Sequence, residues 1–92
     1  MTAKEMFEKL EYKCNEDDDY IEYITTWNDW FGKGVCEIAF DYNIKQIEIY
    51  CYIDRKNSLL SKKNENINVV FSIEELQAIN KQVEELGWNV KD

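Results

Sequence analysis

The residue types that most often carry chemistry are few in this sequence. None of its 92 residues is His, so the commonest general base and the commonest metal ligand are absent. The three cysteines, Cys14, Cys36 and Cys51, lack the close spacing of zinc-binding pairs, and without His no thiol protease is expected. The Gly-Lys-Gly run at residues 32–34 is too short for a phosphate-binding loop. We therefore predict no enzymatic activity, no cofactor and no metal site.

An acidic run, Glu-Asp-Asp-Asp, occupies residues 16–19. It lacks the glycine and the distal glutamate that a calcium loop places at fixed positions. We interpret it as part of a solvated loop over residues 15–19. An electrostatic docking patch and a cation site are the alternatives.

The overall charge narrows the possible partners. The chain has 19 Asp and Glu against 11 Lys and Arg, a formal net charge of −8. Nucleic acids and anionic membranes are bound largely through Lys and Arg, so neither is expected as a direct partner. The sequence has no basic start followed by an apolar run, as secretory signals have, and no apolar stretch of membrane-spanning length. We expect a cytoplasmic protein with free thiols, in which Cys36 and Cys51 pack as small hydrophobes.

Both ends of the chain have the pattern of amphipathic helices. Residues 2–11 place Ala3, Met6, Phe7 and Leu10 on one face, and Thr2 with Glu5 forms a capping box. Residues 73–86 have an apolar stripe and a second capping box at their start. The stripe consists of Ile73, Leu76, Ile79, Val83 and Leu86. Gly87 is expected as a left-handed cap, with Trp88 as its hydrophobic contact.

Four strands are predicted between these helices, at residues 20–27, 35–42, 46–53 and 67–71. Each of these segments either alternates between apolar and polar residues or is rich in β-branched and aromatic residues. Loops are expected at residues 28–34 and 54–66, the second containing Arg55, Lys56, Lys62 and Lys63. The short connection at residues 43–45 indicates a hairpin. The sides expected to face the core are Ile21, Tyr23, Thr25 and Trp27; Cys36, Ile38, Phe40 and Tyr42; and Ile47, Ile49, Cys51 and Ile53. The prediction is a single α+β domain over residues 1–92: a four-stranded antiparallel sheet with both helices packed on one face, in the order αββββα.

The opposite face of the sheet is the main candidate for function. It combines tyrosines with carboxylates, a composition that suits protein binding because Tyr offers rigid contact area with a polar tip. The candidate binding residues are Tyr20, Glu22, Glu37, Asp41, Glu48, Tyr50 and Tyr52, together with Trp30 from the loop at residues 28–34. Two alternatives stay open, because the face could simply be solvated and Trp30 could fold back to cap the core.

The two terminal segments also resemble a group of small proteins. Residues 2–12, TAKEMFEKLEY, and 73–88, IEELQAINKQVEELGW, are similar to the ends of small phage and prophage proteins of low-GC Gram-positive bacteria. In that pattern Gly stands where this chain has Glu11. The resemblance implies an accessory protein working in the bacterial cytoplasm, and it implies no catalytic residue.

We therefore expect a non-enzymatic phage or prophage accessory protein that binds another protein. One alternative is an acidic mimic of nucleic acid that inhibits a host nucleic-acid-binding or defence protein. The second alternative is a homodimer joined through the open sheet face or an edge strand.

Overall fold

The computed structural model describes residues 1–29, 32–55, 64–66 and 71–88. It confirms an α+β fold in which a short helix, an antiparallel sheet of four strands β1–β4 and a second helix follow one another along the chain. The elements are α1 (Ala3–Lys9), β1 (Lys13–Glu16), β2 (Tyr20–Asp29), β3 (Gly32–Asp41), β4 (Gln46–Arg55) and α2 (Ile73–Glu85), with a three-residue strand β5 (Asn64–Asn66) added beside β4. The strands lie side by side in chain order.

The strand assignments differ from the prediction in four places. The predicted strands at 20–27, 35–42 and 46–53 are present as β2, β3 and β4, and β2 and β3 extend into the predicted loop at 28–34. The predicted loop at 15–19 is wrong for Asn15 and Glu16, because both belong to β1 and pair with β2. The predicted loop at 54–66 is wrong at both ends, which belong to β4 and β5. Of the predicted strand at 67–71, only Phe71 is described, and it lies in no strand.

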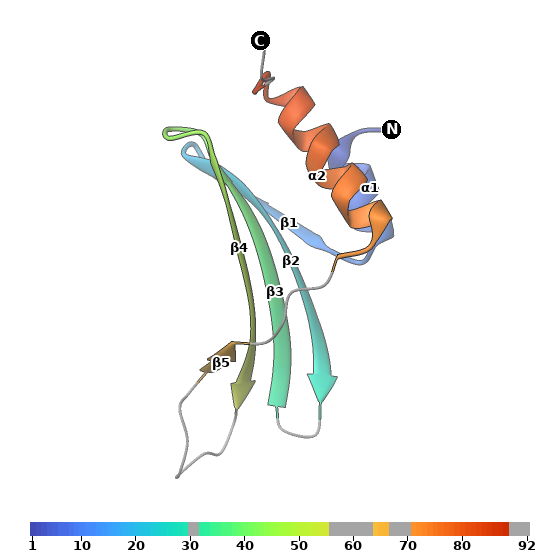
Figure 1. The fold of residues 1–92 in the computed structure, drawn as a ribbon, viewed down its shortest axis with the longest axis vertical. Coiled ribbons are helices and arrows are strands. Elements are labelled where there is room, and N and C mark those ends of the chain that lie inside the picture. The colour runs from blue at the N-terminus through green and yellow to red at the C-terminus, as the bar shows by residue number, and fades with distance from the viewer. Residues whose placement is uncertain (30–31, 56–63, 67–70, 89–92) are drawn as a thin grey trace.

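Both helices lie on one side of the sheet, near the end where β3 turns into β4 (Figure 1). The core between them and the sheet contains Phe7 of α1, Tyr23 of β2 and Phe40 of β3, each with no exposed surface, and Ile79 of α2 at 8% exposure. The ring of Phe7 stacks on that of Tyr23 with centroids 3.9 Å apart. The Tyr23 hydroxyl donates a hydrogen bond to Oε1 of Gln82, which is also buried. This hydrogen bond satisfies a polar side chain that burial would otherwise penalise.

A second tyrosine, Tyr12, directly precedes β1 and connects the sheet to α2. Tyr12 is buried and its hydroxyl donates a hydrogen bond to the Glu75 carboxylate. Burial and this hydrogen bond raise the pKa of Tyr12, and burial raises that of Tyr23, so both are neutral at physiological pH. Glu75 also accepts a hydrogen bond from the backbone N–H of Ser72, as the predicted capping box requires.

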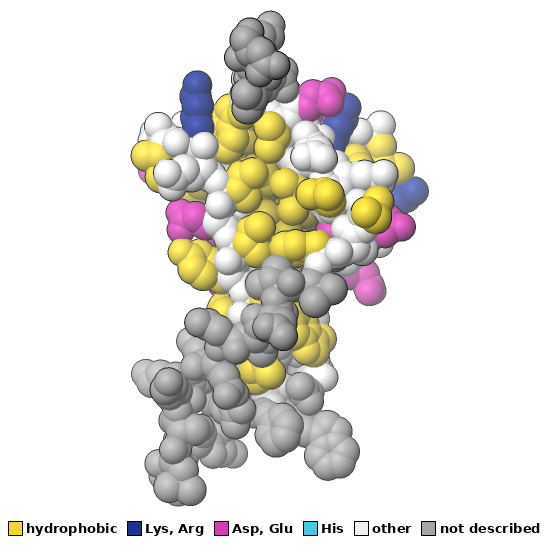
Figure 2. All heavy atoms as spheres, viewed as in Figure 1, with side chains coloured by type: hydrophobic (Ala, Val, Ile, Leu, Met, Phe, Trp, Pro, Cys, Tyr) yellow, Lys and Arg dark blue, Asp and Glu magenta, His cyan; other side chains and the backbone are white. Residues whose placement is uncertain are grey.

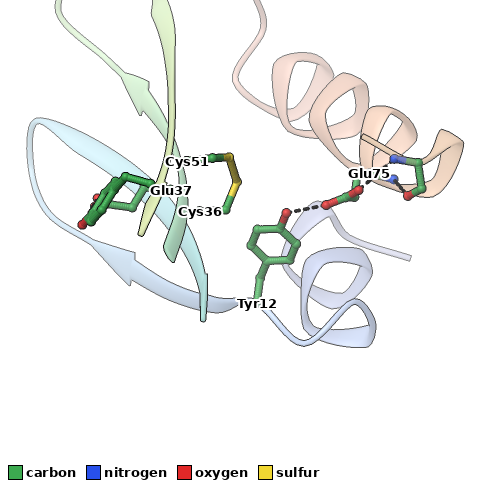
Figure 3. The surroundings of a disulfide bond; sticks show 7 residues. Tyr12, Cys36, Glu37, Cys51 and Glu75 are labelled. Atoms are coloured by element: carbon green, nitrogen blue, oxygen red, sulfur yellow. Dashed lines mark hydrogen bonds between the residues drawn. A yellow bond between two sulfur atoms is a disulfide. The ribbon is translucent and has the colours of Figure 1, made fainter. Parts of the chain in front are cut away.

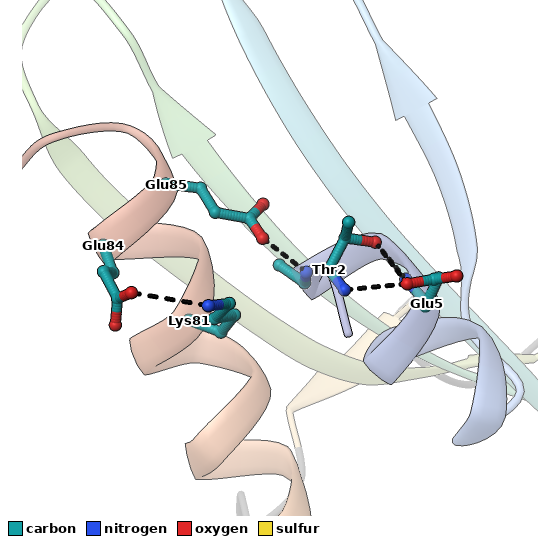
Figure 4. Close-up of polar contacts among 6 residues, drawn as sticks. Thr2, Glu5, Lys81, Glu84 and Glu85 are labelled. Carbon is teal, nitrogen blue, oxygen red and sulfur yellow. Dashed lines mark hydrogen bonds and ion pairs between the residues drawn. The ribbon is translucent and has the colours of Figure 1, made fainter.

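The helices are held to each other by a polar contact at their ends. The backbone N–H of Ala3, in the first turn of α1, donates to Oε2 of Glu85 at 2.9 Å (Figure 4). This carboxylate meets an unpaired donor at the positive end of α1, where negative charge is favoured. The predicted capping box of Thr2 and Glu5 is present beside it.

Cys36 and Cys51 face each other across β3 and β4 and form a disulfide, so the prediction of free thiols is wrong for this pair. Cys14 is free, as predicted, and burial raises the pKa of its thiol. The disulfide lies on the side of the sheet that faces Tyr12 and Glu75, whereas Glu37 lies on the opposite side (Figure 3). The predicted facing of Cys36 and Cys51 is therefore confirmed.

The helices cover less of the sheet than the sequence predicts. Ile47 and Ile49 on β4 were expected in the core but are 36% and 37% exposed, and Trp27 near the far end of β2 is 40% exposed. The first apolar residues of the α2 stripe, Ile73 and Leu76, are also exposed. The buried core is confined to β2, β3 and the two helices, together with Tyr12 before β1.

Both helices end with the same backbone arrangement. The residue after each C-cap, Glu11 or Gly87, has a positive φ, and the N–H of the next residue bonds back to Phe7 or Val83. The prediction for Gly87 is confirmed, whereas Glu11 takes the same left-handed conformation with a side chain. A residue with a Cβ is disfavoured there by roughly 1–2 kcal/mol.

Replacing Glu11 with Gly is therefore expected to raise the free energy of unfolding by about 1 kcal/mol, because glycine removes the Cβ clash. Urea unfolding of the two proteins measures the difference. Glu11→Ala is the control, since it removes the same charge and keeps the Cβ. An equal gain from both substitutions would attribute the effect to charge and contradict this explanation.

The Tyr23–Gln82 hydrogen bond gives a second prediction. Tyr23→Phe should lower the free energy of unfolding by about 1–3 kcal/mol, because it leaves Oε1 of buried Gln82 without its donor. The double variant Tyr23→Phe/Gln82→Met removes both polar groups at similar volume, and it should recover much of that loss. If the single variant is as stable as the wild type in urea, the hydrogen bond does not hold α2 to the sheet.

Candidate protein-binding surface

The side of the sheet opposite the helices, called here the outer face, brings together most of the predicted binding residues. Strand alternation and register place Tyr20 and Glu22 of β2, Glu37 and Asp41 of β3, and Glu48, Tyr50 and Tyr52 of β4 on this side. The predicted grouping of these seven residues on one face follows from this register. Trp30, the eighth, lies outside the described residues.

The register places two carboxylates of the outer face in one row across the sheet. Glu22, Ala39 and Glu48 lie directly opposite one another on β2, β3 and β4. The small side chain of Ala39 leaves a shallow hollow of about 160 Å³ between the two glutamates, and Tyr20 and Asp41 complete its lining. Alternation along β3 places Ala39 on this face with Glu37 and Asp41. Its importance is visible only once the register sets it between two longer side chains.

Neutral hydrogen-bond donors hold each of these carboxylates. Asn15 donates to Glu22 at 3.0 Å, and the hydroxyl of Tyr52 donates to Glu37 at the same distance. The Tyr50 hydroxyl donates to Glu48 at 2.8 Å, and this contact raises the pKa of Tyr50. These contacts fix the direction of the side chains and leave their negative charge in place.

Asp41 differs from the three glutamates because it also stabilises the β3–β4 turn. Its Oδ1 accepts hydrogen bonds from the backbone N–H groups of Asn43 and Ile44. Such a turn-forming contact is an ordinary local role for Asp. Its place beside the hollow is therefore explained in part by the turn.

Among the residues whose side chains the structure describes, no ion pair joins a carboxylate of the outer face to a Lys or Arg. The ion pair between described side chains joins Lys81 and Glu84 on α2, on the helix side of the sheet (Figure 4). Lys13 and Lys33 are the basic residues that strand alternation places on the outer face in the described part. Lys13 is a diagonal neighbour of Glu22, whereas the register sets Lys33 away from the hollow. Carboxylates that are positioned but not neutralised attract a positively charged surface.

The acidic run does not form a metal site in the part of the chain described. Within residues 1–29, 32–55, 64–66 and 71–88 no cluster of three His, Cys, Asp or Glu side chains could hold an ion. Glu16 accepts a hydrogen bond from the Tyr42 hydroxyl, and Asp19 accepts one from the Asn43 side chain. These two residues thus tie the turn between β1 and β2 to the turn between β3 and β4.

No helix of the described residues is long and apolar enough to cross a membrane. The basic residues predicted at 54–66 lie outside the described side chains, although Arg55 ends β4.

No family model, no curated protein and no solved structure matches this chain.

Proposed function

We propose that this protein is a non-enzymatic binding module whose outer face contacts a basic surface on another protein. The observation that carries the proposal is the row Glu22–Ala39–Glu48, in which two oriented carboxylates flank a hollow and form no ion pair with a described side chain. Tyr50, which is 55% exposed, adds aromatic area beside Glu48. Aromatic side chains and complementary charge are the features that supply affinity and orientation at protein interfaces.

The setting we propose is that of a phage or prophage accessory protein in the bacterial cytoplasm. Its support is the resemblance of residues 2–12 and 73–88 to such proteins. The Cys36–Cys51 disulfide argues against a cytoplasmic setting, because disulfides persist mainly in oxidising compartments. A cytoplasmic location therefore requires that this pair be reduced in the cell.

A charge-neutralised variant tests the binding proposal. Glu22→Gln, Glu37→Gln and Glu48→Gln together remove three charges from the outer face while keeping similar side-chain shapes. Proteins captured from a lysate of the cells that encode the wild-type chain should be lost from this triple variant. Binding to the wild type should also weaken as ionic strength rises past ~0.1 M, where the Debye length is about 10 Å.

The matched control removes three charges from elsewhere. Glu8→Gln, Glu74→Gln and Glu84→Gln change exposed residues of the two helices and give the same net charge as the first variant. Partners should be retained by this control. Equal loss from both triple variants would mean that total charge, and not the outer face, governs binding, and would contradict the proposal.

The alternative of nucleic-acid mimicry is favoured by the same oriented carboxylates. If the partner binds the outer face in place of nucleic acid, a duplex oligonucleotide should displace it competitively. Salt-insensitive binding would exclude mimicry. The homodimer alternative predicts a mass of two chains by light scattering at micromolar concentration, and a monomer would exclude it.

A further inference from the structure

The edge of β4 that faces away from β3 carries a second binding feature, which adjoins the outer face at Glu48. β4 pairs with β3 along Gln46–Arg55, but on its other side β5 pairs only with Tyr52, Ile53 and Asp54. No described strand pairs with residues 46–51 on that side. An uncovered edge of this kind can accept another strand.

The register indicates which backbone groups this edge presents. Cys36 and Cys51 are directly opposed with Cα atoms 4.1 Å apart, close to the short spacing of a pair that is not hydrogen-bonded to each other. Pairs alternate along an antiparallel ladder, so Ile49 opposite Ile38 and Ile47 opposite Phe40 are of the same type. The N–H and C=O groups of Ile47 and Ile49 therefore point away from β3, toward the open edge.

The side chains of these two residues are exposed beside a cleft, and of the two only Ile47 lines it. Their side chains lie on the helix side of the sheet and are more than one-third exposed. Ile47 lines a cleft of about 420 Å³ with Val83, Trp88, Gly87 and Lys45. Figure 2 shows hydrophobic side chains gathered over this half of the molecule, where β4 and α2 lie.

Leu76 extends the apolar surface along α2. It is 49% exposed and precedes Val83 by seven residues, which places both on one side of the helix. An extended segment lying on the β4 edge would place every second side chain toward this surface and the others toward Glu48 on the outer face.

We propose that the β4 edge binds an extended segment of another protein as an added strand. Its alternate side chains would be apolar, against Ile47 and Ile49, and basic, beside Glu48. Backbone hydrogen bonds would give affinity, and the alternating side chains would give specificity, as in known cases of strand addition. Opposite charges directly across a strand pair add to the stability of the pairing.

Charge argues against a second copy of this chain as the occupant. Residues 46–54 contain no Lys or Arg, so a second β4 would bring no cation to Glu48. Each copy also carries a net charge of −8. Repulsion between the copies therefore favours a basic segment over self-association.

The test uses the full chain, labelled with ¹⁵N, and a nine-residue peptide in which lysine and valine alternate. Its ends are acetylated and amidated. The peptide should slow hydrogen exchange at the amides of Ile47 and Ile49 by about tenfold or more at saturation. Methylating the peptide nitrogens that face β4 should weaken binding about tenfold per lost hydrogen bond, as a net loss near 1.4 kcal/mol requires.

A substitution in the protein gives an independent test of the same proposal. Ile49→Pro removes an N–H that points to the open edge, a position where proline is compatible with a strand. It should weaken the alternating peptide about tenfold, whereas Ile49→Val, the matched control, should change affinity less than about twofold. The N-methylated peptide keeps the test decisive if the proline variant does not fold.

Three results would overturn the proposal. A peptide of the same composition with its lysines grouped could bind equally well, which would indicate charge attraction alone. The two amides could be protected in the monomer without peptide, which would show that the edge is already paired. They could instead be protected in a concentration-dependent dimer, which would make a second copy the occupant. Protection of the Ile47 and Ile49 amides reports on the β4 edge, whereas the loss of captured partners from the Glu→Gln variant reports on the outer face; Glu48 belongs to both surfaces.

Discussion

The stacking of Phe7 on Tyr23 and the hydrogen bond from Tyr23 to Gln82 determine how the rest of the molecule is arranged. Through this one side chain α1, β2 and α2 meet, with ring centroids 3.9 Å apart on one side and a buried amide on the other. Both helices are thereby fixed over β2 and β3. Since the two helices are short, nothing described is left to cover β4 or the opposite face of the sheet.

Two kinds of exposed surface follow from that limited coverage. The outer face is polar, with carboxylates held in place by Asn15, Tyr50 and Tyr52. The β4 edge is apolar on the helix side, where Ile47 and Ile49 are exposed and Ile47 lines a cleft with Val83 and Trp88. Large uncovered apolar surface in a small domain often marks a site of interaction. The surfaces differ in chemistry, so one chain can contact a partner through both.

Local pattern was sufficient to predict much of this fold. Capping boxes predicted both helix starts, Gly87 predicted the end of α2, and alternation predicted the central strands, because each of these signals depends on a few neighbouring residues. How much of the sheet the two helices cover could not be predicted in this way. Ile47 alternates as well as Ile38 does, yet only Ile38 lies beneath a helix, and that difference depends on where α2 docks.

The candidate site was predictable to a similar extent. Strand periodicity placed Glu22, Glu37 and Glu48 on one face, but only the register set Ala39 between two of them. The strand β1 was missed because its sequence, Lys-Cys-Asn-Glu, is short and polar, and pairing with β2 stabilises it despite low strand propensity. The disulfide likewise depends on the register that opposes Cys36 and Cys51.

The central claim is that the side of the sheet opposite the helices is the side that binds. Hydroxyl-radical footprinting of the chain, with and without a partner recovered by capture, tests this most directly. Tyr20 and Tyr50 on the outer face should lose reactivity in the complex, while Ile73 at the exposed start of α2 should keep it. Protection of Ile73 with unchanged reactivity at both tyrosines would contradict the claim.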